Sequence, residues 1–449
     1  MRNSSKTQTP SIFGVNLGTA VSKSEKLSVA IDVTVDPATA GGIAQVILGL
    51  VHALGALRDG TEEYLLVVDS DAQVEYFRSF MGPNQRFAKK PARTFARRAS
   101  DSLARAAKRV YPNHDSHHFP GHQVISDGFY EALECDVVHF PHQRFVICGL
   151  PSIFNPHDLQ HLHFPQFFSA QQLLERDNLF RAGCHFSHAV AVSSQWVKED
   201  VIHHYRIVPD KVQVIPWGPP TEAHPEPSEQ EMAAVRETFN PDQPFALYPA
   251  MTWPHKNHVR LLEALARLRD DHGLVLPLVC TGSRLQPFWS TIEKRIADLN
   301  LGTQVQFTGF VSQVELRAIY RLARFLVMPT LFESDSSPIY EAWLEGLPVT
   351  CSNVTSLPAQ TLDAARLFDP YDVGAIAQAL LEMVRDDGLR KTLRARGLKR
   401  LKDYEWERTA KAYRALYRRA LNRSLTNEDR WLLSWDWMQE PGKSMEASS

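Results

Sequence analysis

The sequence predicts an α/β protein built around two parallel sheets. Short apolar runs rich in β-branched residues alternate with segments whose apolar residues recur at helical spacing, which is typical of parallel sheets. The alternation occurs twice, before and after a polar stretch rich in proline at 217–230. Domains usually have roughly 100–200 residues, so a chain of 449 residues has room for two such domains.

The first alternation opens with a buried strand at 27–33. A helix follows, because the apolar residues from Ile43 to Leu57 recur at i, i+3 and i+4. Further strands are predicted at 64–68, 137–140, 152–155, 188–193 and 212–216.

The second alternation begins after the polar stretch. Its strands are predicted at 245–250, 276–282, 305–309, 325–330 and 347–353, with a helix at 259–271 and a last helix at 406–422. We expect a disordered lead-in at 1–26, a first domain at 27–220, a second domain at 221–412, and a C-terminal helix and loose tail at 413–449.

Composition excludes several classes of protein. Lysine and arginine (49) nearly balance aspartate and glutamate (51), and 44% of residues are hydrophobic. These values exclude disordered, collagen-like and coiled-coil chains and argue against a dedicated nucleic-acid binder. The five cysteines contain no CxxC pair, so a reducing compartment is expected. No apolar run reaches the roughly 18–20 residues that a membrane span needs.

The segment at 329–353 carries the most informative pattern. Ser337 is a candidate helix N-cap, Pro338 suits the first helical position, and Gly346 suits the position after the helix. Free backbone N–H groups at 336–339 would then form an anion site at the helix N-terminus. Glu333 before the helix and Glu341 inside it could bind sugar and ribose hydroxyls. The alternative is that both are solvated charges near a helix start.

A second pattern lies at 248–265, where a strand ends in a turn that contains proline. Lys256 opens the next helix there and could neutralise a diphosphate leaving group. The alternative is a surface lysine near a helix start. Both patterns follow strands, where open α/β sheets bind their ligands.

These motifs together resemble the family-four (group 1) retaining glycosyltransferases, which use nucleotide sugars. Glu333 and Glu341 match the E-x7-E signature of that family. The other matching segments are Gly41-Gly42, NPHDLQHLHFPQFF (155–168), AVSSQWVKEDV (191–201), HKN (255–257) with LLEAL, and VQFTGFVSQVELRAIY (305–320). The resemblance covers about residues 27–420.

The resemblance implies the GT-B fold, in which two Rossmann-like domains face a central cleft. It implies that Lys256 and amides near Ser336 and Ser337 hold the donor diphosphate, and that Glu341 holds the ribose and Glu333 the transferred sugar. His157 would contact the sugar or the acceptor. The remaining implied donor contacts are the backbone of Gly41 and Gly42 and, at the nucleobase, the backbone near Phe310 and Val311.

The same resemblance implies a reaction class. A sugar would move from a nucleotide diphosphate to a hydroxyl of a glycan or lipid-linked acceptor, with retention at the anomeric carbon. No metal ion and no further cofactor are expected, and no nucleic-acid partner. The expected context is bacterial surface polysaccharide, lipopolysaccharide or glycolipid synthesis, with a mannosyl- or rhamnosyl-type donor favoured. The alternatives are a nucleotide-sugar epimerase of the same fold and a non-catalytic nucleotide-sugar-binding module.

The sequence departs from the family pattern in two places. Many members carry an arginine about six residues before the lysine, where this chain has Ala250 and Met251. His255 or Arg284 could supply the missing positive charge. The usual glycine-rich loop is replaced by ESDSS (333–337), which changes the lining of the sugar pocket.

Three other signals point to different chemistry. Asp69-Ser70-Asp71 follows a strand in the manner of a metal–diphosphate motif. His157, His161 and His163 cluster with His139 and His142 nearby, but a metal site needs a further ligand and outer carboxylates. The basic segment 86–109 is either a solvated helix or a contact with anionic lipid. The cysteine pattern predicts a cytoplasmic location. If the basic segment binds lipid, peripheral binding at the inner face of the plasma membrane is expected.

Overall fold

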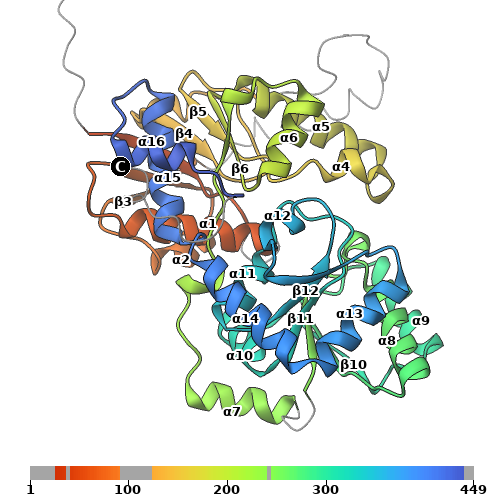
Figure 1. The fold of residues 1–449 in the computed structure, drawn as a ribbon. Coiled ribbons are helices and arrows are strands. Elements are labelled where there is room, and N and C mark those ends of the chain that lie inside the picture. The colour runs from red at the N-terminus through yellow and green to blue at the C-terminus, as the bar shows by residue number, and fades with distance from the viewer. Residues whose placement is uncertain (1–25, 37–40, 92–123, 240–243, 439–449) are drawn as a thin grey trace, which may run out of the picture.

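The chain forms two lobes, each built around a parallel sheet (Figure 1). The structure is a computed structural model that describes residues 26–36, 41–91, 124–239 and 244–438. The first sheet has the strand order β3-β2-β1-β4-β5-β6-β7 and the second has the order β10-β9-β8-β11-β12-β13. The predicted α/β class with two parallel sheets is confirmed. The predicted lead-in up to residue 25 and residues 92–109 of the basic segment lie outside the described residues.

The first lobe contains every strand predicted for it and one further strand. Its strands are β1 (Ser28–Asp32), β2 (Glu63–Val68), β3 (Gln85–Lys89), β4 (Val137–Phe140), β5 (Ser152–Phe154), β6 (Ala189–Val192) and β7 (Val212–Val214). Its helices include α1 (Gly41–Ala56), α2 (Asp71–Arg78), α4 (Gln160–His163), α5 (Ala170–Phe186) and α6 (Gln195–Tyr205). The strand β3 was not predicted because it lies at the sheet edge and its mixed sequence, QRFAK, is only partly buried.

The second lobe also contains its five predicted strands and an extra edge strand. The strands are β8 (Ala246–Pro249), β9 (Leu278–Thr281), β10 (Val305–Gly309), β11 (Phe325–Met328), β12 (Val349–Ser352) and β13 (Ala365–Phe368). The helices include α7 (Glu229–Thr238), α8 (His258–His272), α9 (Phe288–Asp298), α10 (Gln313–Leu322), α11 (Ser337–Leu344), α12 (Leu357–Thr361), α13 (Val373–Arg385) and α14 (Asp387–Leu401). Helix α7 begins with a Ser228 capping box, so the polar stretch becomes helical at its end.

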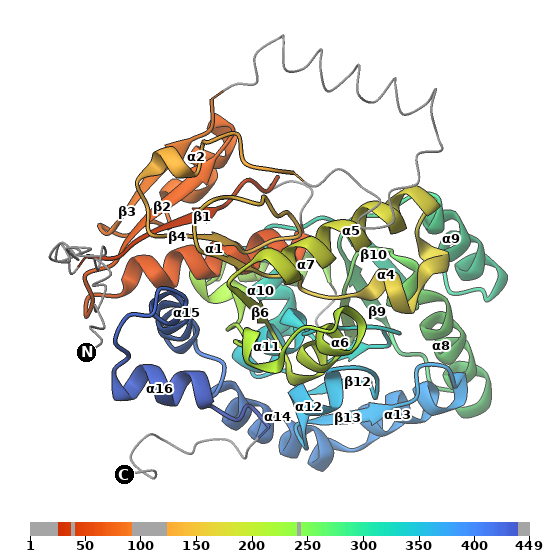
Figure 2. The same cartoon turned by 90° about the horizontal axis from the view of Figure 1, so that it is seen from above.

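The C-terminal helices return to the first lobe. Helix α15 (Trp406–Ala420) lies beside α1, and α16 (Asn427–Ser434) packs against α15 (Figures 1 and 2). The helix predicted at 406–422 is confirmed. The expectation of a loose tail from 423 is wrong for residues 427–434, because Thr426 caps α16 and Leu432 is buried against the core. None of the helices in the described part of the chain combines the length and apolarity of a membrane span.

Candidate active site

The loop after β11 leads into α11, as the sequence predicted. The helix begins at Ser337 with Ser336 as its N-cap, one residue earlier than expected, and Gly346 follows the helix with φ +68°. The Ser336 N–H donates to Gln360 Oε1 at 3.0 Å, and the Ile339 N–H donates to the Ser336 carbonyl at 3.1 Å. Pro338 has no N–H to donate. The prediction of free amides is therefore wrong for Ser336 and Ile339.

Glu333 and Lys256 form an ion pair, although they lie 77 residues apart in the sequence. Lys256 ends a short turn that starts at Pro254, and its carbonyl accepts a hydrogen bond of 2.6 Å from the Tyr248 hydroxyl. The Glu333 carbonyl accepts a bond of 2.9 Å from the Ser356 hydroxyl. The fold thus fixes the backbone on both sides and brings the predicted sugar-binding and diphosphate-binding groups together.

Glu341 lies inside the lobe, one turn into α11, and is 6% exposed. The Tyr320 hydroxyl donates to Glu341 Oε2 at 2.8 Å. Burial raises the pKa of Glu341 to about 7, and this hydrogen bond opposes the rise. The alternative of a solvated charge is therefore wrong for this residue.

Asp335 in the ESDSS segment is a buried group that sequence reasoning did not single out. Its Oδ1 accepts a hydrogen bond of 2.6 Å from the Tyr340 hydroxyl. Burial raises the pKa of Asp335 well above its ordinary value, and nearby Glu333 acts in the same direction. The only signal in the sequence was the departure of this loop from the family pattern.

The two candidates for the missing positive charge, His255 and Arg284, differ in their surroundings. Burial and the charge of Lys256 hold the pKa of His255 well below its ordinary value, so this ring is neutral near pH 7. Arg284 donates to the Phe307 carbonyl at 2.5 Å and its guanidinium lies 4.8 Å from the ring centroid of Trp289. His255 therefore supplies no positive charge beside Lys256, and the role of Arg284 stays a prediction.

The first lobe places its predicted residues at the ends of strands and the start of α1. Gly41 opens α1 with φ +53°, and a Cβ built there would lie 3.4 Å from Met251 Sδ of the second lobe. His157 follows β5 with φ +65° and its Nε2–H donates to the Pro141 carbonyl at 2.9 Å. Burial lowers the pKa of His157, so its imidazole is neutral near pH 7.

Two loops of the second lobe complete the placement of the predicted residues. Phe310 follows β10 with 73% of its surface exposed, and Val311 is half-buried beside it. The loop that carries Glu333 touches the first lobe, where the Ser194 hydroxyl donates to the Ser334 carbonyl at 2.8 Å. In the same loop, the Phe332 ring lies 5.5 Å from the Trp196 ring. Glu333 is therefore held where the two lobes meet.

The predicted histidine cluster does not form one site. Each ring has its own partner: His139 contacts Tyr417 and Asn155, His142 contacts Asp32, His157 contacts Pro141, His161 contacts Tyr205, and His163 contacts Asp200.

The Asp69-Ser70-Asp71 segment is a helix start. Ser70 caps α2 by accepting a hydrogen bond from the Gln73 N–H, and Asp71 pairs with Lys89 at 2.7 Å. Acidic residues are common in the first turn of a helix. The local geometry thus explains this motif without a diphosphate.

Comparison with known proteins adds to this geometry. Residues 230–400, which hold the Glu333–Lys256 pair and Glu341, match the family model described as "Glycosyl transferases group 1". The second lobe therefore carries a domain of the group 1 glycosyltransferase family. A relative in Escherichia coli, "O-antigen chain mannosyltransferase B", is 36% identical over 184 residues, which are 39% of this chain and 46% of that protein. The chain thus matches about half the length of this relative.

Solved structures show that the chain has the GT-B fold. Sucrose-phosphate synthase (tll1590) from Thermosynechococcus elongatus superposes with a TM-score of 0.64 at 20% identity, covering 89% of this chain and all of that chain. Anabaena Alr3699/HepE in complex with UDP and glucose gives 0.62 at 15% identity, covering 87% and 99%. The predicted family and fold class are confirmed, while the role of each site residue stays a prediction.

Proposed function

We propose that the protein is a retaining glycosyltransferase that moves a mannosyl-type sugar from a nucleotide diphosphate to a hydroxyl acceptor in bacterial surface polysaccharide synthesis. The observation that carries this proposal is the Glu333–Lys256 pair at the carboxyl ends of β8 and β11, with buried Glu341 on the helix that follows Glu333. The mannosyl assignment rests on the printed name of the Escherichia coli relative. The structure superposed from Anabaena holds UDP, which supports a nucleotide diphosphate donor.

In the proposed reaction the donor lies against the second lobe. Lys256 would neutralise the diphosphate, Glu341 would accept the ribose hydroxyls, and Glu333 would orient the sugar. The bond between the anomeric carbon and the phosphate oxygen breaks while the acceptor oxygen bonds to that carbon on the same face. The acceptor proton passes to the departing phosphate oxygen. Glu333 therefore binds the sugar and is no nucleophile, unlike the carboxylate of a retaining glycosidase.

His157 and the two glycines would complete the site from the first lobe. The Pro141 carbonyl fixes the His157 ring, whose neutral state suits a hydrogen bond to a sugar hydroxyl. Gly41 leaves room for the donor beside Met251, since a side chain there would enter the space between the lobes. All five cysteines are free thiols, which supports the expected reducing compartment.

A donor screen followed by a product assay tests this proposal. The purified chain is heated with UDP-, GDP-, dTDP- and ADP-linked sugars, and a ligand that binds only the folded state raises the melting temperature. The stabilising mannosyl donor is then incubated with glycan acceptors, and NMR determines the anomeric configuration of the product. Transfer with retention is expected. Interconversion of the donor sugar without an acceptor would instead favour the epimerase, which the named relatives do not favour.

We also propose that transfer needs no metal ion at the diphosphate, because Lys256 supplies a positive charge there. The initial rate of transfer should change by less than about twofold after EDTA treatment. Loss of transfer, restored by Mg²⁺ or Mn²⁺, would contradict the proposed role of Lys256 as the principal counter-charge.

A further inference from the structure

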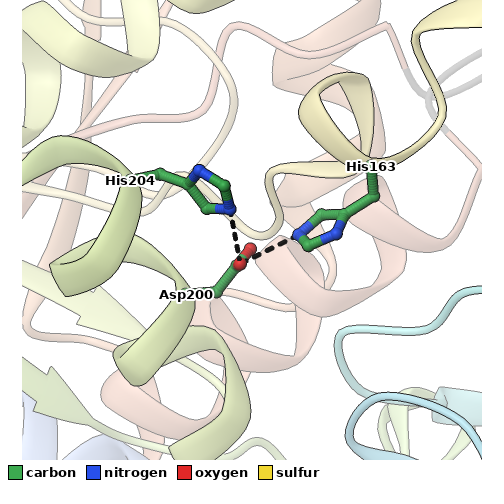
Figure 3. Close-up of side chains that lie close together, drawn as sticks. All are labelled: His163, Asp200 and His204. Carbon is green, nitrogen blue, oxygen red and sulfur yellow. Dashed lines mark hydrogen bonds and ion pairs between the residues drawn. The ribbon is translucent and has the colours of Figure 1, made fainter.

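Three side chains of the first lobe converge at its boundary with the second lobe, outside the residues proposed to bind the donor (Figure 3). His163 comes from α4, while Asp200 and His204 come from successive turns of α6. His163 Nε2 lies 2.8 Å from Asp200 Oδ1, and His204 Nε2 lies 3.3 Å from the same oxygen. We call these three residues the His–Asp–His trio.

The ligand atoms of the trio suit a divalent transition metal. One atom of each residue lies within 4.8 Å of the others. Zinc binds histidine nitrogen and carboxylate oxygen at about 2.0–2.2 Å, so tetrahedral ligand atoms stand roughly 3.3 Å apart. The spacing of Asp200 and His204 at i and i+4 puts both on one face of α6, as in helical zinc-binding pairs.

A second observation points to a missing partner. The Asp200 side chain is 7% exposed, and its Oδ2 is buried with no hydrogen-bond partner among the described residues. A buried carboxylate oxygen that has lost its water and gained no donor destabilises the folded state. The Nε2 atoms of His163 and His204 both contact Asp200 Oδ1, as the dashed lines show (Figure 3). Asp200 Oδ2 can therefore bind an ion without breaking a hydrogen bond of its own.

We propose that the His–Asp–His trio binds one divalent transition-metal ion, with Zn²⁺ as its reference ligand. Each imidazole would coordinate through Nε2 as the neutral tautomer that carries its proton on Nδ1, and Asp200 would supply one oxygen. Three protein ligands leave a fourth position for water. The ion would join α4 to α6 beside Phe332, whose ring lies 5.4 Å from the His163 ring.

Occupancy of this site would act on the lobe boundary. The His163 ring also lies 5.4 Å from the Trp196 ring, so a metal bond would fix the aromatic surface on which Phe332 packs. Phe332 immediately precedes Glu333 in the loop that joins the lobes. The ion would stabilise this contact and take no part in the transfer step.

Metal stoichiometry and spectroscopy test the proposal on the full chain. The protein is treated with EDTA, freed of chelator, and titrated with Zn²⁺ by calorimetry at pH 7.5. We expect one ion per chain. Replacing Zn²⁺ by Co²⁺ should give the visible absorption bands of a tetrahedral cobalt centre with nitrogen and oxygen ligands. Both signals should be lost in His204→Ala, with affinity falling at least a hundredfold.

His203→Ala is the matched control, because His203 precedes His204 on the same helix and its ring lies 4.9 Å from that of His204. This variant should keep the stoichiometry and the cobalt spectrum. Asp200→Asn should weaken binding while circular dichroism shows an intact fold. Absence of a bound ion in the parent protein, or equal binding by the parent and His204→Ala, would overturn the proposal. Because the readout is metal binding, it can fail independently of the transfer assay.

Discussion

Burial of Glu341 brings the pKa of its carboxyl group close to neutral pH. Its pKa of about 7 exceeds the ordinary value of 4.5 mainly because the group is removed from water. The folded chain therefore binds more protons at this residue than the unfolded chain between those two pH values. The contribution of this group to the free energy of unfolding is therefore present at low pH and is lost as the pH rises toward 7.

Glu341→Gln should remove that pH dependence. Since the amide cannot ionise, the ligand-free variant should be more stable than the parent at pH 8, by on the order of 1–3 kcal/mol, and nearly equal at pH 4.5. Nucleotide affinity should fall at pH 8, because ribose hydroxyls bind a carboxylate more strongly than an amide. Thermal unfolding and calorimetry at both pH values measure these effects. An equal stability difference at both pH values would contradict the inference.

The Glu333–Lys256 pair predicts different results for its two partners. Lys256→Ala should weaken nucleotide binding and reduce transfer by roughly 10²–10³, as for the loss of one charge-stabilising donor. Glu333→Gln should also reduce transfer, yet it frees Lys256 from its ion pair. Nucleotide binding by Glu333→Gln should therefore stay equal or improve.

Steady-state transfer rates and calorimetry with the nucleoside diphosphate separate these effects. Lys294→Ala is a suitable control, since this lysine is 77% exposed and pairs only with nearby Asp298 on α9 in the described structure. Weaker nucleotide binding in Glu333→Gln would show that the ion pair builds the diphosphate site rather than competing with it.

Sequence patterns identified the residue types of the site but not their state. The spacing of Glu333 and Glu341 and the turn before Lys256 were visible in the sequence. The ion pair was not, because it joins residues whose separation along the chain says nothing of their distance. Burial of Asp335 was also hidden, since its partner Tyr340 is set by the packing of α11.

At the scale of elements, Gln360 determines how α11 begins. Its side-chain amide accepts a hydrogen bond from the Ser336 N–H at 3.0 Å and donates one to the Ser336 carbonyl at 2.9 Å. Two hydrogen bonds from α12 thus fix the backbone of the N-cap residue. The sequence predicted the helix start within one residue, because proline and glycine mark its ends locally. The sequence did not reveal these two hydrogen bonds, because a glutamine 24 residues away supplies both.

Gln360→Ala should destabilise the chain by about 1–3 kcal/mol, because it leaves the buried Ser336 N–H without its partner and removes one of the two hydrogen bonds that the Ser336 carbonyl accepts. The Michaelis constant for the donor should rise if the loop then moves. Urea unfolding and steady-state kinetics measure both. Gln378→Ala, on the exposed face of α13, is the control and should be nearly neutral. A neutral effect of Gln360→Ala would mean that solvent replaces the lost bonds.

Edge strands show where element prediction fails. Strands at the centre of both sheets are continuous apolar runs, because helices cover both faces of a parallel sheet. At the edges, β3 and β13 are only partly buried and keep charged residues within the strand. Their sequences lack the pattern on which strand prediction depends, although their backbones pair in register with β2 and β12.

At the scale of the whole molecule, ion pairs and a hydrogen bond join the C-terminal helix α15 to the first lobe. Arg414 binds Asp59 at 2.6 Å, Arg418 binds Glu62 at 2.5 Å, and the Tyr413 hydroxyl accepts a hydrogen bond of 2.6 Å from Asn155. The amphipathic pattern of α15 predicted a helix but not its partner. Its apolar face could equally have packed on the second lobe, from which the chain emerges.

Trp406 at the start of α15 is the centre of this contact. Its ring fills the space left by two glycines, since a Cβ built at Gly49 would lie 2.2 Å from the ring and one at Gly218 would lie 2.8 Å from it. Its Nε1–H donates to the Pro219 carbonyl at 2.9 Å. One side chain therefore joins α1, the segment between the lobes and the C-terminal helix.

A double-mutant cycle tests this arrangement. Trp406→Ala should cost about 3–5 kcal/mol through the cavity it leaves, and Gly49→Ala about 1–3 kcal/mol through overpacking against the ring. In the Trp406→Ala background the added methyl at residue 49 has room, so Gly49→Ala should cost almost nothing there. Gly302→Ala is the control, since a Cβ at Gly302 meets no described atom within 4 Å. Additive effects, measured by urea unfolding, would show that α1 and Trp406 do not share this space.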